Sequence, residues 1–200
     1  MCLYKGLGPD ALYMAAAVNS GGRNHELYRY TESGGLEILT ESLMDDDSPS
    51  AWGSNPSQLT VFDGRLFFAA LVFPEGSELF WYNGTGVPEL VADTNPQGSF
   101  FPLWLLPVHG AMFMQGYMNL DIREELYRML AVEGSLLVPP SAPALYASLY
   151  DFRGSKPRHL TLYQNDTLVF IATQGPDSDD RFQDTEYLFQ LDLRNTSAGP

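Results

Sequence analysis

Cysteine is almost absent from this sequence of 200 residues, which contains a single one, Cys2. One cysteine cannot close an internal disulfide, and it cannot by itself build a cysteine-based zinc site. Long apolar runs are also lacking, because no stretch approaches the roughly 18–20 residues of a membrane-spanning helix. The first residues show no basic stretch, apolar stretch or small-residue cleavage site of a signal peptide. We therefore expect neither a disulfide framework nor membrane insertion.

Basic residues are scarce as well: 11 Lys and Arg stand against 25 Asp and Glu, which gives a formal net charge of −14. A nucleic-acid binder must neutralise phosphates, and an anionic membrane surface attracts basic segments, so we expect neither partner. What the chain does have is apolar material, with 44% hydrophobic and 13% aromatic residues. That content supports a packed core, and the length suits one all-β domain or at most two smaller ones.

The main signal in the sequence is an internal repeat. An apolar segment recurs at intervals of roughly 50 residues, at 11–16, 65–70, 111–116 and 167–172. Another short apolar segment precedes the last three copies and ends in a turn such as Asp63-Gly64 or His109-Gly110. Asp-Gly and related pairs supply the positive φ that a two-residue hairpin needs. The pattern predicts a β-hairpin in each copy, with only Leu3-Tyr4 available as the first strand of the first copy.

Two further strands are predicted after each hairpin. The third strand is expected at 26–30, 78–82, 125–129 and 187–191. The fourth is expected at 36–39, 89–91 and 136–138, and the last copy ends before it. The copies thus cover approximately 1–41, 53–92, 99–139 and 154–200 of a single domain over 1–200. One helix is predicted at 142–150, where leucine and tyrosine pairs have i,i+4 spacing.

Four antiparallel strands per copy, with a period of about 40–50 residues, are typical of β-propeller blades. We therefore predict an all-β, β-propeller-like fold of four repeats with the last strand missing. A β-sandwich with coincidental similarity between strands is the alternative. The apolar second and third strands predict a core made of Leu12, Met14, Leu66, Phe68, Met112, Met114, Leu168 and Phe170, with Leu27, Leu79, Leu126 and Leu188.

The second copy resembles a known repeat. Residues 78–85 are Glu-Leu-Phe-Trp-Tyr-Asn-Gly-Thr, and 90–96 are Leu-Val-Ala-Asp-Thr-Asn-Pro. Over residues 53–102 the chain is similar to the bacterial repeat family named for Glu-Leu-Trp-x-x-Asp-Gly-Thr, also described as hyalin-like, with a β-propeller fold. The other copies keep only the skeleton of this repeat. The resemblance implies an extracellular or cell-surface bacterial protein, and it supplies no catalytic residues to carry over.

Strand parity predicts which face of the molecule carries function. Successive connections in an antiparallel sheet alternate between two faces, so the long connections share one of them. This loop face collects acidic and aromatic residues, which suit a cation, a basic protein surface or a glycan. Alternatively, the acids only solvate the loops and the aromatics anchor them to the core. The candidate ligand-binding residues are Trp52, Phe73, Tyr117, Tyr150 and Phe182.

A calcium site is the one cofactor that the sequence suggests. Its candidate ligands are Asp177, Asp179, Asp180 and Asp184, because calcium prefers several carboxylate oxygens. The segment is not an EF-hand, since Arg181 and Phe182 stand where that motif needs other residues. A solvated acidic loop is the alternative, and Asp45-Asp46-Asp47 is a weaker candidate. The three histidines lack metal-ligand spacing, and no Gly-x-Ser-x-Gly nucleophile elbow occurs.

These observations favour a non-enzymatic binding or surface-assembly module with a protein or glycan ligand. The alternative is a secreted hydrolase or lyase that acts on a polysaccharide or another polymer, with carboxylates of the loop face as acid and base. A pair of carboxyl groups about 5–10 Å apart in a cleft would favour the enzyme. The missing last strand leaves an open edge, which predicts self-association or pairing with a neighbouring segment.

Overall fold

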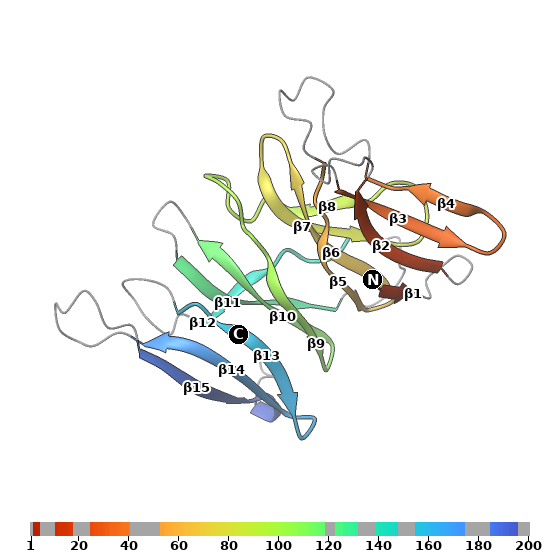
Figure 1. Ribbon diagram of the computed structural model, residues 1–200. Coiled ribbons are helices and arrows are strands. Elements are labelled where there is room, and N and C mark those ends of the chain that lie inside the picture. Colours follow the sequence, from red (N-terminus) through yellow and green to blue (C-terminus); the bar gives the residue numbers. More distant parts are fainter. Residues whose placement is uncertain are drawn as a thin grey trace.

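The computed structural model describes residues 2–4, 11–17, 25–40, 53–118, 123–131, 139–147, 155–174 and 185–195 (Figure 1). These residues form four antiparallel sheets and, beyond them, the single 3-10 turn η2 (Leu193–Asn195). The fold is therefore all-β, as predicted. No helix in the described residues is long and apolar enough to cross a membrane.

The four sheets follow one another along the chain. Sheet I contains β1 (Cys2–Tyr4), β2 (Ala11–Ala17), β3 (His25–Thr31) and β4 (Gly35–Ile38). Sheet II contains β5 (Ser57–Phe62), β6 (Arg65–Val72), β7 (Gly76–Tyr82) and β8 (Glu89–Ala92). Sheet III contains β9 (Leu103–Val108), β10 (Ala111–Met118), β11 (Arg123–Leu130) and β12 (Ala144–Ala147). Sheet IV contains β13 (Arg158–Tyr163), β14 (Thr167–Gln174) and β15 (Thr185–Asp192).

Each sheet is a meander in which consecutive strands are neighbours. The tight turns between the first and second strands match their sequence, because Asp63 and Gly64 have φ of 50° and 68°, and His109 and Gly110 have φ of 46° and 76°. These positive values are what a two-residue hairpin of this kind requires. The repeat also recurs in the backbone entering the first strands of sheets II to IV, where positive φ is found at Asn55, Phe101 and Lys156, and again at Gln58, Trp104 and His159.

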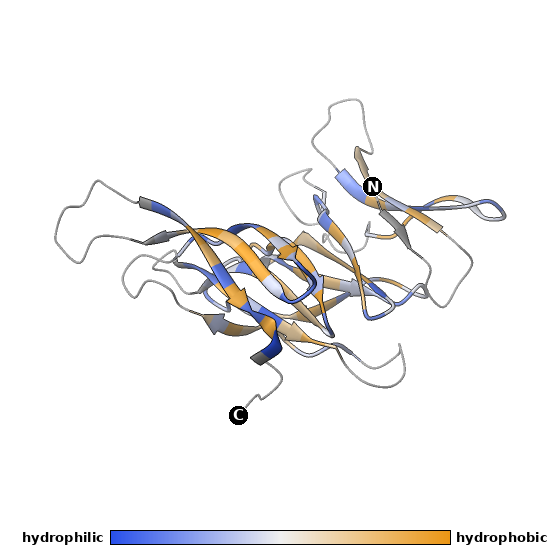
Figure 2. Ribbon diagram, turned by 90° about the horizontal axis from the view of Figure 1, so that it is seen from below, coloured by the Kyte–Doolittle hydropathy of each residue, from blue (hydrophilic) through white to orange (hydrophobic). Residues whose placement is uncertain are grey.

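The sheets contact each other mainly through their first strands. β1 lies against β5, β5 against β9, and β9 against β13, so the sheets form an open arc with sheets I and IV at its two ends (Figure 1). Among the described residues, no strand of one sheet pairs with a strand of another, so the four sheets do not form one closed sheet. Three apolar clusters fill the spaces between successive sheets, and hydrophobic residues are concentrated on the strands (Figure 2).

Most of the predicted core is confirmed. Nine of its residues are buried, namely Leu27, Leu66, Phe68, Leu79, Met112, Met114, Leu126, Leu168 and Phe170. Leu12 and Met14 are only half-buried, and the prediction for Leu188 is wrong, because its side chain is 66% exposed. The three exceptions lie in sheets I and IV, and among the described residues each of these two sheets has a neighbouring sheet on one side only.

The helix predicted at 142–150 is wrong where the structure describes it. Ala144–Ala147 form strand β12, which pairs antiparallel with β11. The strand satisfies an edge of β11 that would otherwise lack hydrogen-bond partners. Tyr146 packs edge-on against Phe113 with 5.2 Å between ring centroids, and the Arg128 guanidinium lies 4.8 Å above its ring. The strand predicted at 136–138 lies outside the described residues, and the link from β11 to β12 is long instead of tight.

Candidate binding surface on the loop face

An inter-sheet clamp fixes the segments that enter sheets II, III and IV. The backbone carbonyls of Ser54, Phe100 and Ser155 each accept a 2.7 Å hydrogen bond from the second strand of the sheet that follows. The next residue in each segment donates its N–H to the third strand of the preceding sheet; Phe101, for example, donates to the Ser77 carbonyl at 2.9 Å. Each segment is therefore held between two sheets, which gives the loop face a rigid base.

Buried glutamates complete this clamp. Glu26 accepts hydrogen bonds from Ser54 Oγ at 2.6 Å and from Thr40 Oγ1 at 2.5 Å. Glu125 accepts from Ser155 Oγ at 2.7 Å, and Glu78 accepts from the Phe100 N–H at 2.7 Å. Sequence analysis missed this role, although the signal was present: glutamate stands at the same place in three copies. These carboxylates connect sheets and are buried, so they do not face a ligand.

Glu78 differs from the other clamp glutamates because no hydroxyl of a described residue donates to it. Its Oε2 atom is buried and has no hydrogen-bond partner among the described residues. Burial raises the pKa of Glu78 to about 8, and the charges of Asp93 and Glu75 act in the same direction. The side chain is therefore largely protonated at neutral pH. It lies beneath the acidic part of the loop face and adds little negative charge to it.

Three aromatic rings lie on the loop face, and two of them, Phe101 and Tyr117, meet at the junction of sheets II and III. Phe73, in the short link between β6 and β7, is 71% exposed, and Phe101, which enters β9, is 48% exposed. Phe101 and Tyr117 form an edge-on pair with 5.3 Å between ring centroids. The Tyr117 hydroxyl donates to Glu124 Oε1 at 2.9 Å. Burial and this hydrogen bond raise the pKa of Tyr117 to about 12, so it stays a neutral donor.

We define the loop-face patch as Phe73, Phe101 and Tyr117 together with Glu75, Asp93 and Glu124. Glu75 and Asp93 are near enough to act on the charge of Glu78, and Glu124 is held by Tyr117. The turn beside Phe73 is fixed by close packing, because a Cβ on Gly76 would come within 2.3 Å of Ser99 Oγ. The patch thus combines exposed aromatic surface with three carboxylates, of which Glu124 is held by the Tyr117 hydroxyl.

Two of the predicted ligand-binding residues, Phe73 and Tyr117, belong to this patch. The other three, Trp52, Tyr150 and Phe182, lie outside the described residues. The same holds for the predicted calcium ligands Asp177, Asp179, Asp180 and Asp184 and for the acidic run at 45–47. The part of the chain that the structure describes contains no group of three or more His, Cys, Asp or Glu side chains that could hold a metal. Phe101, which sequence analysis did not select as a candidate, joins the patch.

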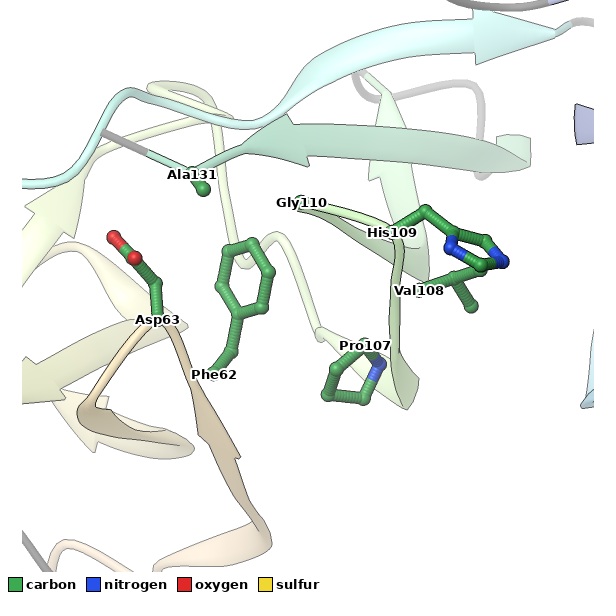
Figure 3. A pocket seen from close by; sticks show the side chains of 7 residues that line it. All are labelled: Phe62, Asp63, Pro107, Val108, His109, Gly110 and Ala131. Atoms are coloured by element: carbon green, nitrogen blue, oxygen red, sulfur yellow. The ribbon is translucent and has the colours of Figure 1, made fainter. Parts of the chain in front are cut away.

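A shallow pocket of about 300 Å³ lies on the opposite face, at the tight turns between first and second strands (Figure 3). Its lining includes Phe62, Asp63, His109 and Ala131, and Figure 3 shows the His109 ring directed away from Phe62. Asp63 forms an ion pair with Arg65. The lining contributes one carboxylate, so this pocket does not offer the acid and base pair that the enzyme hypothesis needs.

No family model matches this chain, and neither a curated protein nor a solved structure matches it.

Proposed function

We propose that this chain is a non-enzymatic binding module of β-propeller-like architecture that works in surface assembly outside the cell. Support for the architecture comes from four sheets of similar register that contact one another through their first strands. Propeller blades are arranged in this way around a central axis. The open arc represents part of such a ring, and the extracellular location rests on the resemblance of residues 53–102 to surface repeats.

The observation that carries the function is the loop-face patch. Phe73 and Phe101 expose aromatic surface, beside the carboxylates of Glu75 and Asp93. Lys and Arg side chains bind such a combination well, because the ring face attracts a cation and the carboxylate pairs with it. The formal charge of −14 also draws basic partners. We therefore assign a basic protein segment as the ligand, in preference to a neutral glycan.

The enzyme alternative has weaker support. Catalysis on a polymer requires two carboxyl groups that reach the substrate. Glu78 has the raised pKa expected of an acid catalyst, but its side chain is fully buried and bonded to the Phe100 N–H. The raised pKa of Glu78 therefore follows from its burial between sheets II and III, and this position keeps the side chain away from any substrate.

The test is binding of the chain to an array of Arg- and Lys-rich peptides and, in parallel, to a glycan array. We expect binding to basic peptides that weakens at least tenfold in the Phe73→Ala/Phe101→Ala variant. Val87→Ala is the matched control, because Val87 is 60% exposed on a turn of the opposite face. Binding to neutral glycans alone, or equal binding by the double variant and the control, would contradict the proposal.

A further inference from the structure

The face of sheet IV that points away from sheet III carries a group of apolar side chains among polar ones, and no described sheet covers it. In sheets I, II and III, a leucine of the third strand packs against the following sheet, and Leu27, Leu79 and Leu126 are each 0% exposed. Strand register gives the equivalent residue in sheet IV: Leu79 pairs with Ala69, and Leu188 pairs with Ile171. Leu188 is 66% exposed, since no described sheet lies beyond it.

A second position repeats this difference. Phe62 and Val108, each the last residue before a tight turn, are 7% and 4% exposed. Tyr163 has the same position before the turn of sheet IV, and it is 56% exposed. Tyr163 pairs with Thr167 and Leu188 pairs with Ile171, so alternation along β14 places them on one face. We call Tyr163, Val169, Ile171 and Leu188 the forward face; Thr167, Gln190 and Asp192 lie on the same side of the sheet and border it.

Sheet I also has an incompletely covered face, on the side that points away from sheet II. Leu12 pairs with Tyr30, and Met14 pairs with Tyr28. The corresponding pairs in sheet II, Leu66 with Tyr82 and Phe68 with Phe80, are buried against sheet I. In sheet I the equivalent side chains are half-buried, and Tyr30 is 45% exposed. We call Leu12, Met14, Tyr28 and Tyr30 the back face.

We propose that the forward face of sheet IV docks onto the back face of sheet I in a second copy of this chain, head to tail. This proposal rests on the assembly role proposed above and names its partner. The occupant follows from the molecule itself, because the same pairing of a forward and a back face occurs three times inside the chain. Both halves of a fourth such interface are present, at opposite ends of the arc (Figure 1).

The contact is heterologous, because different surfaces of the two copies meet. If the rotation from one copy to the next closes after two copies, they form a ring. If it does not close, further copies add to form a longer array. The clamp is altered at this junction: Tyr187 occupies the position of Glu26, Glu78 and Glu125, as shown by its pairing with Ala172. The contact therefore lacks the buried carboxylate of the internal junctions, and the part of it made by the apolar side chains should depend weakly on salt concentration.

The first experiment measures mass by size-exclusion chromatography with light scattering over a hundredfold range of concentration. We expect the mass to rise toward two copies or more with concentration. Leu188→Glu should keep the chain monomeric, whereas Val87→Glu, at a residue of similar exposure, should associate like the unchanged chain. Both variants place a charge on an exposed position, so folding is not at risk. A monomer at every concentration would overturn the proposal.

A second experiment fixes the orientation. In a Cys2→Ser background, we expect Leu188→Cys and Tyr30→Cys chains to form a mixed disulfide when combined. Each alone should form few linked dimers, and predominant 188–188 links would overturn the head-to-tail geometry. The peptide array, repeated with Leu188→Glu, separates this inference from the loop-face function. Unchanged peptide binding by a chain that never associates would overturn only the docking, and absent peptide binding by a chain that associates would overturn only the ligand.

Discussion

Sheets II and IV have nearly the same strand register, but their third strands lie in different surroundings. Leu79 of sheet II packs among Phe67, Trp81 and Phe100, whereas Leu188 of sheet IV faces outward. The local sequences, Glu-Leu-Phe and Tyr-Leu-Phe, differ little. In this fold a leucine contributes to stability only where a following sheet covers it, so burial is decided by the neighbour and not by the strand itself.

The largest expected effect tests this difference directly. Leu79→Ala should lower the free energy of unfolding by about 2–5 kcal/mol, because it removes a fully buried side chain and leaves a cavity. Leu188→Ala in the isolated chain should change it by no more than about 0.5 kcal/mol. Urea unfolding at low protein concentration, where association is minimal, measures both. Equal losses would show that sheet IV is covered in solution.

The clamp glutamate of sheet II should give the stability of the chain a characteristic pH dependence. The folded pKa of Glu78 is raised to about 8, so between its unfolded value of about 4.5 and pH 8 the folded state binds more protons. Stability from this group is complete below pH 4.5 and falls as pH rises to 8, by an amount on the order of a few kcal/mol. Glu78→Gln should flatten that fall, as followed by thermal unfolding at several pH values.

Glu26→Gln is the matched comparison, because Glu26 is also buried but accepts hydrogen bonds from two hydroxyl groups. Its other oxygen accepts from the Ser54 N–H at 3.3 Å, so a glutamine either faces that N–H with its own NH2 group or forces both hydroxyls to reverse, and the replacement should destabilise the chain. Glu78→Gln keeps the acceptor for the Phe100 N–H and should not. A fall in stability for Glu78→Gln as steep as that of the unchanged chain would contradict the raised pKa of Glu78.

How far the sequence could predict this fold is clearest at the clamp. The repeat located the strands, because alternating apolar runs and Asp-Gly turns are local signals. The sequence also shows equivalent segments before the first strands, at Ser54-Asn55-Pro56 and Ser155-Lys156-Pro157. Their serines bond to buried glutamates of the preceding sheet, which lie far away in the sequence, so no local signal predicts these bonds. The helix predicted at 142–150 was wrong because its i,i+4 spacing is a local signal. It carries no information on the edge of β11, with which β12 pairs.

The candidate site was predicted in part for the same reason. Phe73 follows a strand and could be placed on the loop face by parity alone. Phe101 joins Tyr117 only because its segment is bonded between β7 and the second strand of sheet III. The exposure of Leu188 could not be predicted, since the repeat signature of sheet IV is that of a covered blade.

A last expected effect sharpens the comparison between sheet III and the other two clamped sheets. At the clamp, Phe100 replaces the serine found at 54 and 155, and Gly116 replaces the alanine found at 70 and 172. The two changes belong together, because a Cβ on Gly116 would come within 2.0 Å of the Phe100 ring. Gly116→Ala should therefore cost about 1–3 kcal/mol through overpacking.

The double variant Phe100→Ser/Gly116→Ala recreates the pair present in sheets II and IV. Because the Phe100 ring fills the space that a Cβ at position 116 needs, the two effects should not add, and the double variant should lose less stability than the sum of the single variants. Phe100→Ser alone removes a fully buried ring that packs edge-on against Tyr127 at 4.8 Å, so it is the costlier single change. Urea unfolding of the four proteins gives the interaction energy, and strict additivity would mean that Gly116 was not selected to make room for Phe100. A favourable interaction would show that the ring of Phe100, which extends the core toward the loop-face patch, and the glycine beneath it form one unit of the repeat.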